Sequence, residues 1–324
     1  MEIKKIMPLI GIIILIYLLS IVDFKTIIEI FSNIPPLYGF LCLFSVLPII
    51  ISTNIQWQII LKKQKINVSF LYSLKNIFIG YFYGFITPGG FGAYIKALYL
   101  KNESNQPLPK CVSNIITFNT IDFLSLLVLG LIGGFFLSSR FPLIFITIII
   151  VSIIVVSLFV FFLKKEKSQI VFKKIIKSNI FSVIKDRIED PIETFYENLP
   201  TFKDILIPFL LSIIGWIILF TELYLISLLF DIQVPYISFI FIVAVSYVVA
   251  SLPISIYGLG TREVTLITLF SIYSISSEKI ISLSLFWFAV IWILPSIIGA
   301  IITFFESKKL KKLDFSKKQT MNIK

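Results

Sequence analysis

The chain has 324 residues, of which 57% are hydrophobic and only 15% are charged, with a formal net charge of +11 and a mean hydropathy of +0.98. Soluble domains are roughly 25% charged, so this composition excludes an ordinary soluble domain and indicates a lipid environment. Histidine is absent, and the two cysteines, Cys42 and Cys111, each lie alone inside an apolar run. Haem ligation, imidazole catalysis, a cysteine-rich zinc site and a disulfide framework are therefore excluded. We expect no metal, no cofactor and no nucleic-acid partner.

Six apolar runs are long enough to cross a bilayer, a task that takes about 20 residues as a helix. Four of them contain no charged residue, and two contain a single carboxylate each, Asp122 or Glu222. In chain order the six are Ile6–Val22, Leu37–Leu61, Cys111–Ser139, Phe141–Leu163, Ile205–Phe230 and Ile280–Phe305. They are continuous and do not alternate with period two, so they predict helices and not the strands of a barrel. The predicted fold class is an all-α integral membrane protein with about six full transmembrane helices.

Two further apolar elements, Val68–Leu100 and Val234–Tyr273, are interrupted by proline and glycine. If each enters and leaves on the same side, 23 of the 29 basic residues fall on one side of the membrane and only Lys25, Arg140 and Lys279 fall on the other. Basic loops mark the cytoplasmic side, which predicts a multi-pass protein of the cell membrane with both termini in the cytoplasm. If either element instead crosses the membrane twice, every later loop stays on the same side. The distribution of charges therefore does not distinguish a re-entrant hairpin from two spans.

The predicted domain organisation is one transmembrane domain, residues 1–305, followed by a basic cytoplasmic tail, residues 306–324. The domain contains a first half (37–163) and a second half (204–305). Residues 164–203 join them and repeat apolar residues among charged ones, as an amphipathic surface helix does. The small-residue patterns Gly80-x-x-x-Gly84 and Gly130-x-x-Gly133-Gly134 predict faces where helices approach closely.

The two interrupted elements break in a similar way. The first break reads Thr87-Pro-Gly-Gly-Phe-Gly92 and the second reads Leu252-Pro-Ile-Ser-Ile-Tyr-Gly-Leu-Gly260, and in each a basic residue follows a glycine by four positions, at Lys96 and at Arg262. Proline and glycine unwind a helix, and a helix that restarts has free N–H groups that suit a phosphate. One element enters from the cytoplasmic side and the other from outside, which predicts an inverted repeat with a transporter site at the breaks.

Each charged side chain at membrane depth needs a reason, because burying one near the bilayer centre costs at least about 2.5–3.5 kcal/mol. Arg262 either binds a substrate phosphate or pairs within the protein. Neighbouring residues on a regular helix do not face each other, so we expect its internal partner to be a residue other than Glu263, such as Glu222. Lys96 either binds substrate or extends to the cytoplasmic surface. Asp122 and Glu222 fit a structural role better than a functional one.

These residues resemble a known family, the lysylphosphatidylglycerol synthase transmembrane region, also called the flippase-like domain family. The stretch from Leu252 to Glu263 is similar to its P-x-S-x-x-G-x-G-x-R-E signature, the stretch from Thr87 to Ala97 resembles its P-G-x-x-G-E-x-x-R-A patch, and Ile121-Asp122 resembles a third patch that reads E-R-x-x-D. The chain departs from the pattern at Ala93, which replaces an acidic residue, and at Lys96 and Asn119, which each replace arginine. The likeness covers roughly Leu37 to Phe305.

The resemblance implies lipid handling. Bacterial members join this region to a soluble aminoacyl-transferase domain and are implicated in moving the lipid between leaflets, and nothing of that size follows Phe305 here. We therefore expect a flippase, not an enzyme, that binds the anionic headgroup of a phospholipid or polyprenyl-phosphate lipid. The predicted substrate-binding residues are Arg262, Glu263, Gly258, Gly260, Lys96, Gly92, Pro88 and Asp122.

Two other functions stay open. One is a membrane transferase acting on a lipid-linked substrate, against which the sequence has neither an Asp-x-Asp pair nor a nucleotide-binding glycine loop. The other is a non-transporting accessory protein of the membrane. Beyond the lipid, a second copy of the chain or a separate lipid-modifying enzyme is the expected partner.

Overall fold

The structure is a computed structural model that describes residues 23–163, 202–252 and 258–306, together with residues 17, 20 and 199. All regular structure in these residues is helical, which confirms the predicted fold class. Within these described residues, five helices are long and apolar enough to cross a membrane: Pro36–Lys63, Leu108–Leu137, Pro142–Val160, Lys203–Leu229 and Ser277–Glu306. They match five of the six predicted spans. The other, Ile6–Val22, lies almost wholly outside the described residues, as do the linker 164–203 and the tail.

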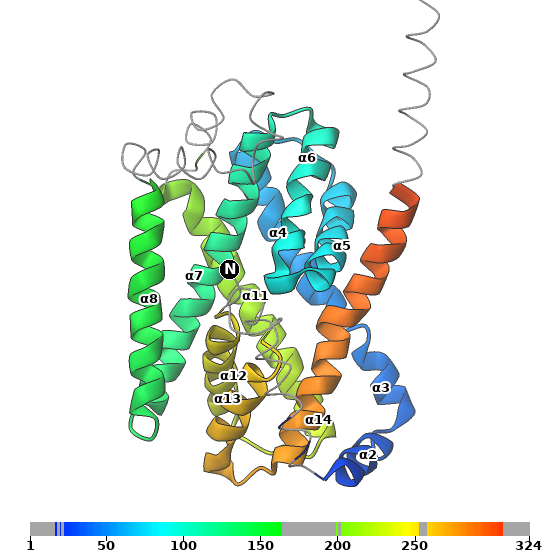
Figure 1. The fold of residues 1–324 in the computed structure, drawn as a ribbon, viewed down its shortest axis with the longest axis vertical. Coiled ribbons are helices and arrows are strands. Elements are labelled where there is room, and N and C mark those ends of the chain that lie inside the picture. The colour runs from blue at the N-terminus through cyan, green and yellow to red at the C-terminus, as the bar shows by residue number, and fades with distance from the viewer. Residues whose placement is uncertain are drawn as a thin grey trace, which may run out of the picture.

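The first interrupted element is a hairpin made of α5 (Phe70–Ile86), the 3-10 helix η1 (Pro88–Ile95) and α6 (Lys96–Ser104). The Asn76 amide donates a hydrogen bond of 3.1 Å to the Lys96 carbonyl, and the Tyr72 hydroxyl donates one of 2.8 Å to the Tyr99 carbonyl. Residues early in α5 therefore meet residues late in the element, so α6 returns antiparallel along α5. The chain enters and leaves this element at the same end of the molecule (Figure 1).

The second interrupted element is also a hairpin, formed by α12 (Tyr236–Ala250) and α13 (Thr261–Phe270). The rings of Phe239 and Phe270 lie 5.3 Å apart at its open end. At its tip, Gly258 approaches Ala250 so closely that a Cβ on Gly258 would lie 2.4 Å from the Ala250 Cβ. This hairpin enters from the opposite end to α5 and α6, as Figure 1 shows. An inverted sequence repeat stays a prediction, and residues 253–257 of the second break lie outside the described residues.

Helix α7 (Leu108–Leu137) holds the two hairpins together, because it packs against both α6 and α12. Its contact with α12 uses the predicted small-residue face. A Cβ on Gly130 would lie 2.4 Å from the Val248 Cγ2, and one on Gly133 would lie 2.8 Å from the Phe241 carbonyl oxygen. The prediction of close helix approach at these glycines is confirmed.

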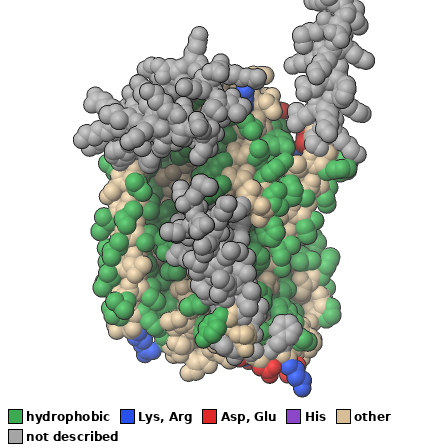
Figure 2. All heavy atoms as spheres, in the orientation of Figure 1, with side chains coloured by type: hydrophobic (Ala, Val, Ile, Leu, Met, Phe, Trp, Pro, Cys, Tyr) green, Lys and Arg blue, Asp and Glu red, His purple; other side chains and the backbone are tan. Residues whose placement is uncertain are grey.

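The remaining long helices are α4 (Val46–Lys63), which continues from α3 (Pro36–Cys42), α8 (Pro142–Leu163), α11 (Phe202–Leu229) and α14 (Ser277–Phe288), which continues through a π-helical turn, η4 (Ala289–Ile293). An ion pair of 3.1 Å between Lys63 and Asp204 joins α4 and α11 at one end, and one of 2.6 Å between Lys279 and Asp231 lies at the other. Hydrophobic side chains cover much of the face in Figure 2, with charged ones near its ends. This distribution suits a lipid-embedded body.

Candidate functional site

A cavity of about 410 Å³ lies at the tip of the first hairpin, where the two halves of the chain meet. Three long helical segments each line it with a residue near their middle: Asp122 on α7, Trp216 on α11 and Trp292 in the π-helical turn that follows α14. The cavity therefore lies at mid-depth in the helical body. A π-helical turn inside a helix is rare and often marks a functional site. Other lining residues are Ser52, Thr53, Gln56, Gly80, Tyr81, Gly90, Ala93, Tyr94, Lys96, Phe118, Asn119, Ser212 and Tyr247.

Lys96 brings a positive charge to this cavity and is only 7% exposed. Its stem lies against Gly80, where a side chain would collide with it. Its amine lies over the rings of Phe118 and Trp57, 5.1 Å and 5.6 Å from their centroids. Among the described residues no carboxylate makes an ion pair with this amine. Lys96 thus points inward and does not extend to the surface, which removes one of the two roles predicted for it.

Trp57 is held in place beneath the amine by a chain of buried hydrogen bonds. Its indole N–H donates to the Asn114 side-chain oxygen at 2.8 Å, and the Asn114 amide donates to the Gln64 side-chain oxygen at 2.6 Å. Trp57 and Asn114 are completely buried. A cation over an aromatic ring gains about 2 kcal/mol when desolvated, so the fixed ring offsets part of the cost of burying Lys96.

Asp122 lines the same cavity and carries its negative charge. The Ser212 hydroxyl donates to one carboxylate oxygen at 2.9 Å, and the Trp216 indole N–H donates to the Asp122 carbonyl at 3.2 Å. These bonds tie α7 to α11 at mid-depth. Asp122 and Lys96 interact electrostatically but form no ion pair. Among the described residues, one basic and one acidic side chain therefore line the cavity, Lys96 and Asp122, and the two do not form an ion pair.

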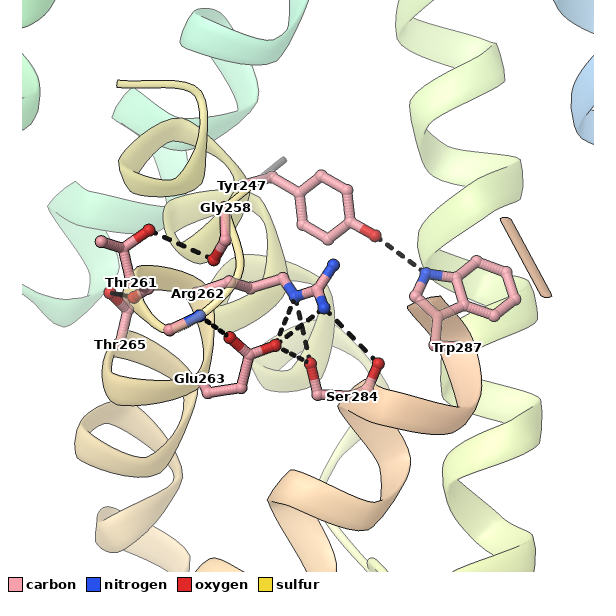
Figure 3. Close-up of polar contacts among 9 residues, drawn as sticks. Tyr247, Gly258, Thr261, Arg262, Glu263, Thr265, Ser284 and Trp287 are labelled. Carbon is pink, nitrogen blue, oxygen red and sulfur yellow. Dashed lines mark hydrogen bonds and ion pairs between the residues drawn. The ribbon is translucent and has the colours of Figure 1, made fainter. Parts of the chain in front are cut away.

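Arg262 lies in a separate cluster (Figure 3). Its guanidinium is 2.7 Å from a Glu263 carboxylate oxygen, and its Nε donates to the Ser284 hydroxyl at 3.0 Å. Arg262 is 2% exposed and Glu263 is fully buried. The hollow beside them measures about 10 Å³, which is room for about one water molecule. Two roles were open for Arg262, binding a substrate phosphate and pairing within the protein, and the structure shows pairing within the protein.

The expectation that Glu263 could not be this partner is wrong, and so is the suggestion of Glu222. Both residues lie in the first turn of α13, which begins after Gly260 in a left-handed conformation (φ 84°). The second Glu263 oxygen accepts the Gly260 backbone N–H, which bends the carboxylate back beside the Arg262 side chain. The rule that neighbouring helix residues do not face each other assumes side chains that extend outward from the helix. Neither the Arg262 nor the Glu263 side chain extends outward. Glu222 lies on α11, with one buried carboxylate oxygen that has no hydrogen-bond partner among the described residues.

Residues 6–299 match the family described as the lysylphosphatidylglycerol synthase TM region. The chain belongs to this family. It is 23% identical to a UPF0104 membrane protein of Pyrococcus horikoshii, with 79% of this chain and 83% of that protein covered. It is 24% identical to a UPF0104 membrane protein of Methanocaldococcus jannaschii, with 95% of this chain and 96% of that protein covered.

Two family positions in the first break shape the hairpin without contributing a charged group. A Cβ on Gly92 would lie 2.1 Å from the Tyr83 carbonyl oxygen, so only glycine fits where η1 crosses α5. The Gly92 N–H donates to the Thr87 hydroxyl at 2.6 Å. Pro88 opens η1, which runs directly into α6. The predicted free N–H groups at the start of α6 are therefore absent from the described structure.

Of the predicted site residues, Lys96 and Asp122 meet at the cavity. Arg262, Glu263, Gly258 and Gly260 form the other cluster. Ala93, Lys96 and Asn119, which depart from the resembled motifs, all line the cavity. Sequence reasoning missed Gln56 and Trp57, although polar residues at 54, 56 and 58 interrupt an otherwise apolar span and could have pointed to them.

Proposed function

We propose that this membrane protein moves a lipid between leaflets and binds the lipid's anionic headgroup at Lys96 in the mid-depth cavity. The observation that carries the proposal is a buried lysine that lines a cavity of about 410 Å³ and has no carboxylate in ion-pair contact among the described residues. A charge kept at membrane depth is costly and marks a functional site by default. A phosphate that enters the cavity would neutralise it.

The size and position of the cavity fit a headgroup without its tails. Ligand pockets of roughly 300–1,000 Å³ enclose small molecules, so a volume of about 410 Å³ accommodates a phosphate and a modest substituent. Tyr94 lines the cavity and is also 42% exposed, so this side chain stands between the cavity and the molecular surface. In the proposed mechanism the headgroup passes beside Tyr94 while the acyl or prenyl chains stay in the surrounding lipid.

The proposal is tested by leaflet exchange of fluorescent lipids in liposomes that contain the purified protein. Lys96→Met should slow exchange of an anionic lipid by roughly ten- to a hundredfold, because a hydrogen bond to a charged group is worth about 1.5–3 kcal/mol. Lys75→Met is the matched control, since Lys75 lies exposed on α5, and it should exchange lipid at the wild-type rate. Equal rates for the two variants would refute the role of Lys96.

The internally paired Arg262 favours a second candidate, a non-transporting accessory protein. An arginine that pairs with Glu263 and Ser284 stabilises a fold without contacting a substrate. This candidate predicts that wild-type liposomes exchange lipid no faster than protein-free ones, while a partner protein still co-purifies with the Lys96→Met variant.

A further inference from the structure

The cavity has many more neutral hydrogen-bonding groups than a bare phosphate needs. Among the residues that the structure describes, Lys96 is its one basic lining residue, and its neutral polar side chains include Ser52, Thr53, Gln56, Asn119 and Ser212. Amides and hydroxyls both donate and accept hydrogen bonds. Phosphate oxygens only accept, so they leave the acceptors of this wall unused. A ligand group with several hydroxyls would use donors and acceptors alike.

Gln56 has an unsatisfied hydrogen-bond donor at the cavity. Its side chain lines the cavity and is only 3% exposed, and its amide nitrogen has no hydrogen-bond partner among the described residues. Leaving a buried donor unsatisfied is unfavourable, and such groups in native proteins usually have a partner. A ligand oxygen in the cavity would supply it.

The remaining wall suits the flat face of a ring. Trp216, Trp292, Tyr81 and Phe118 line the cavity beside the polar groups. Aromatic side chains offer large rigid apolar faces, against which the C–H face of a sugar ring packs while its hydroxyls reach the polar side chains. Asp122 has an oxygen that accepts from Ser212, and a carboxylate accepts further hydrogen bonds from ligand hydroxyls.

We propose that the headgroup bound in this cavity is a phosphate substituted with a sugar or a cyclic polyol. The inference rests on the proposed lipid exchange and names its substrate class. Lys96 contacts the phosphate, Gln56 and Asn119 bond to ring hydroxyls, Asp122 accepts from a hydroxyl, and Trp216 or Trp292 covers a ring face. The same ring can be carried by a phospholipid or by a polyprenyl phosphate.

Liposomes that contain the full-length protein and tail-labelled lipids test this substrate class. Phosphatidylinositol should exchange about tenfold faster than phosphatidic acid or phosphatidylethanolamine, as expected for one or two added hydrogen bonds. Glycosyl polyprenyl phosphate and bare polyprenyl phosphate form a second pair that distinguishes the carriers. Preference for the ring-bearing lipid in either pair supports the inference.

Gln56→Met should lower the ratio of ring-bearing to bare lipid exchange severalfold, while Gln233→Met, at an exposed loop position, should leave the ratio unchanged. Size-exclusion chromatography establishes that both variants are folded. If neither ring-bearing lipid exchanges faster than its bare counterpart, the substrate class is wrong and the proposed lipid exchange survives. If no lipid exchanges faster than in protein-free liposomes, the proposed function fails and the inference fails with it.

Discussion

A Cβ atom on Gly80 would lie 2.7 Å from the Cδ atom of Lys96. The missing side chain on α5 is what leaves room for the lysine stem to cross toward the cavity. Gly80→Ala should therefore displace the lysine and move its amine away from Trp57 and Phe118. We expect lipid exchange to fall severalfold with little loss of stability, because a lysine stem is flexible and can shift without disturbing the backbone.

Gly39→Ala is the matched control for this prediction. A Cβ there meets only the Ile34 Cγ2 at 3.8 Å, an ordinary van der Waals distance. Exchange rates and unfolding midpoints of both variants in detergent are the measurements. A Gly80→Ala protein with the wild-type rate would mean that the position of the Lys96 stem does not matter.

Asn114 positions Trp57 and does not itself line the cavity. Asn114→Leu removes the acceptor of the buried indole N–H and the donor to Gln64. We expect a loss of about 1–3 kcal/mol in the free energy of unfolding, the penalty for an unsatisfied buried group, and a change in tryptophan fluorescence as the ring loosens. Denaturant titration in detergent measures the first effect. Unchanged stability and fluorescence would show that packing alone holds Trp57.

Much of this fold could be predicted from the sequence, because apolar run length and the proline and glycine breaks act locally. The helices from Leu37–Leu61 onward were found within a few residues of their observed ends. The cavity could not be predicted in full, since hydropathy does not say which helices meet. Gln56 reaches the cavity, and Trp57 reaches the Lys96 amine, only because α4 packs against α5, α7 and α11.

Predictions about the charged residues depend on different information. Lys96 and Asp122 were singled out because any charge at membrane depth is costly, and that rule needs no geometry. Assigning a partner to Arg262 needed side-chain directions in the first turn of α13, where Glu263 bends back toward the Gly260 N–H. Sequence spacing does not contain that information.

The sidedness predicted from the lysines is testable by labelling single introduced cysteines in a variant that lacks the two native ones. Cys42 and Cys111 are buried, so a Cys42→Ala, Cys111→Ala background should fold and be unreactive toward water-soluble maleimide. Lys62→Cys should then be labelled only after the cell membrane is opened, and Arg140→Cys should be labelled in intact cells. Both positions are exposed and belong to opposite predicted sides. The reverse pattern would overturn the predicted orientation.

The Arg262–Glu263 pair should behave as a buried ion pair and not as a substrate site. Glu263→Gln leaves the guanidinium buried without its charge partner, which typically costs about 3–5 kcal/mol. Arg262→Met leaves the carboxylate in the same state and should be similarly costly. The double variant Arg262→Met, Glu263→Gln removes both charges and should recover part of the lost stability, so a double-mutant cycle in detergent should give a coupling energy of more than about 1 kcal/mol.

A substrate role predicts a different pattern for the same variants. If Arg262 bound the lipid phosphate, Arg262→Met would keep the wild-type unfolding free energy and lose exchange, and the double variant would be equally inactive. With internal pairing, exchange instead follows stability, because α13 and Ser284 lose the contacts that fix the second hairpin. A double variant with recovered stability should therefore regain exchange relative to either single variant, whereas Lys96→Met should stay slow at full stability.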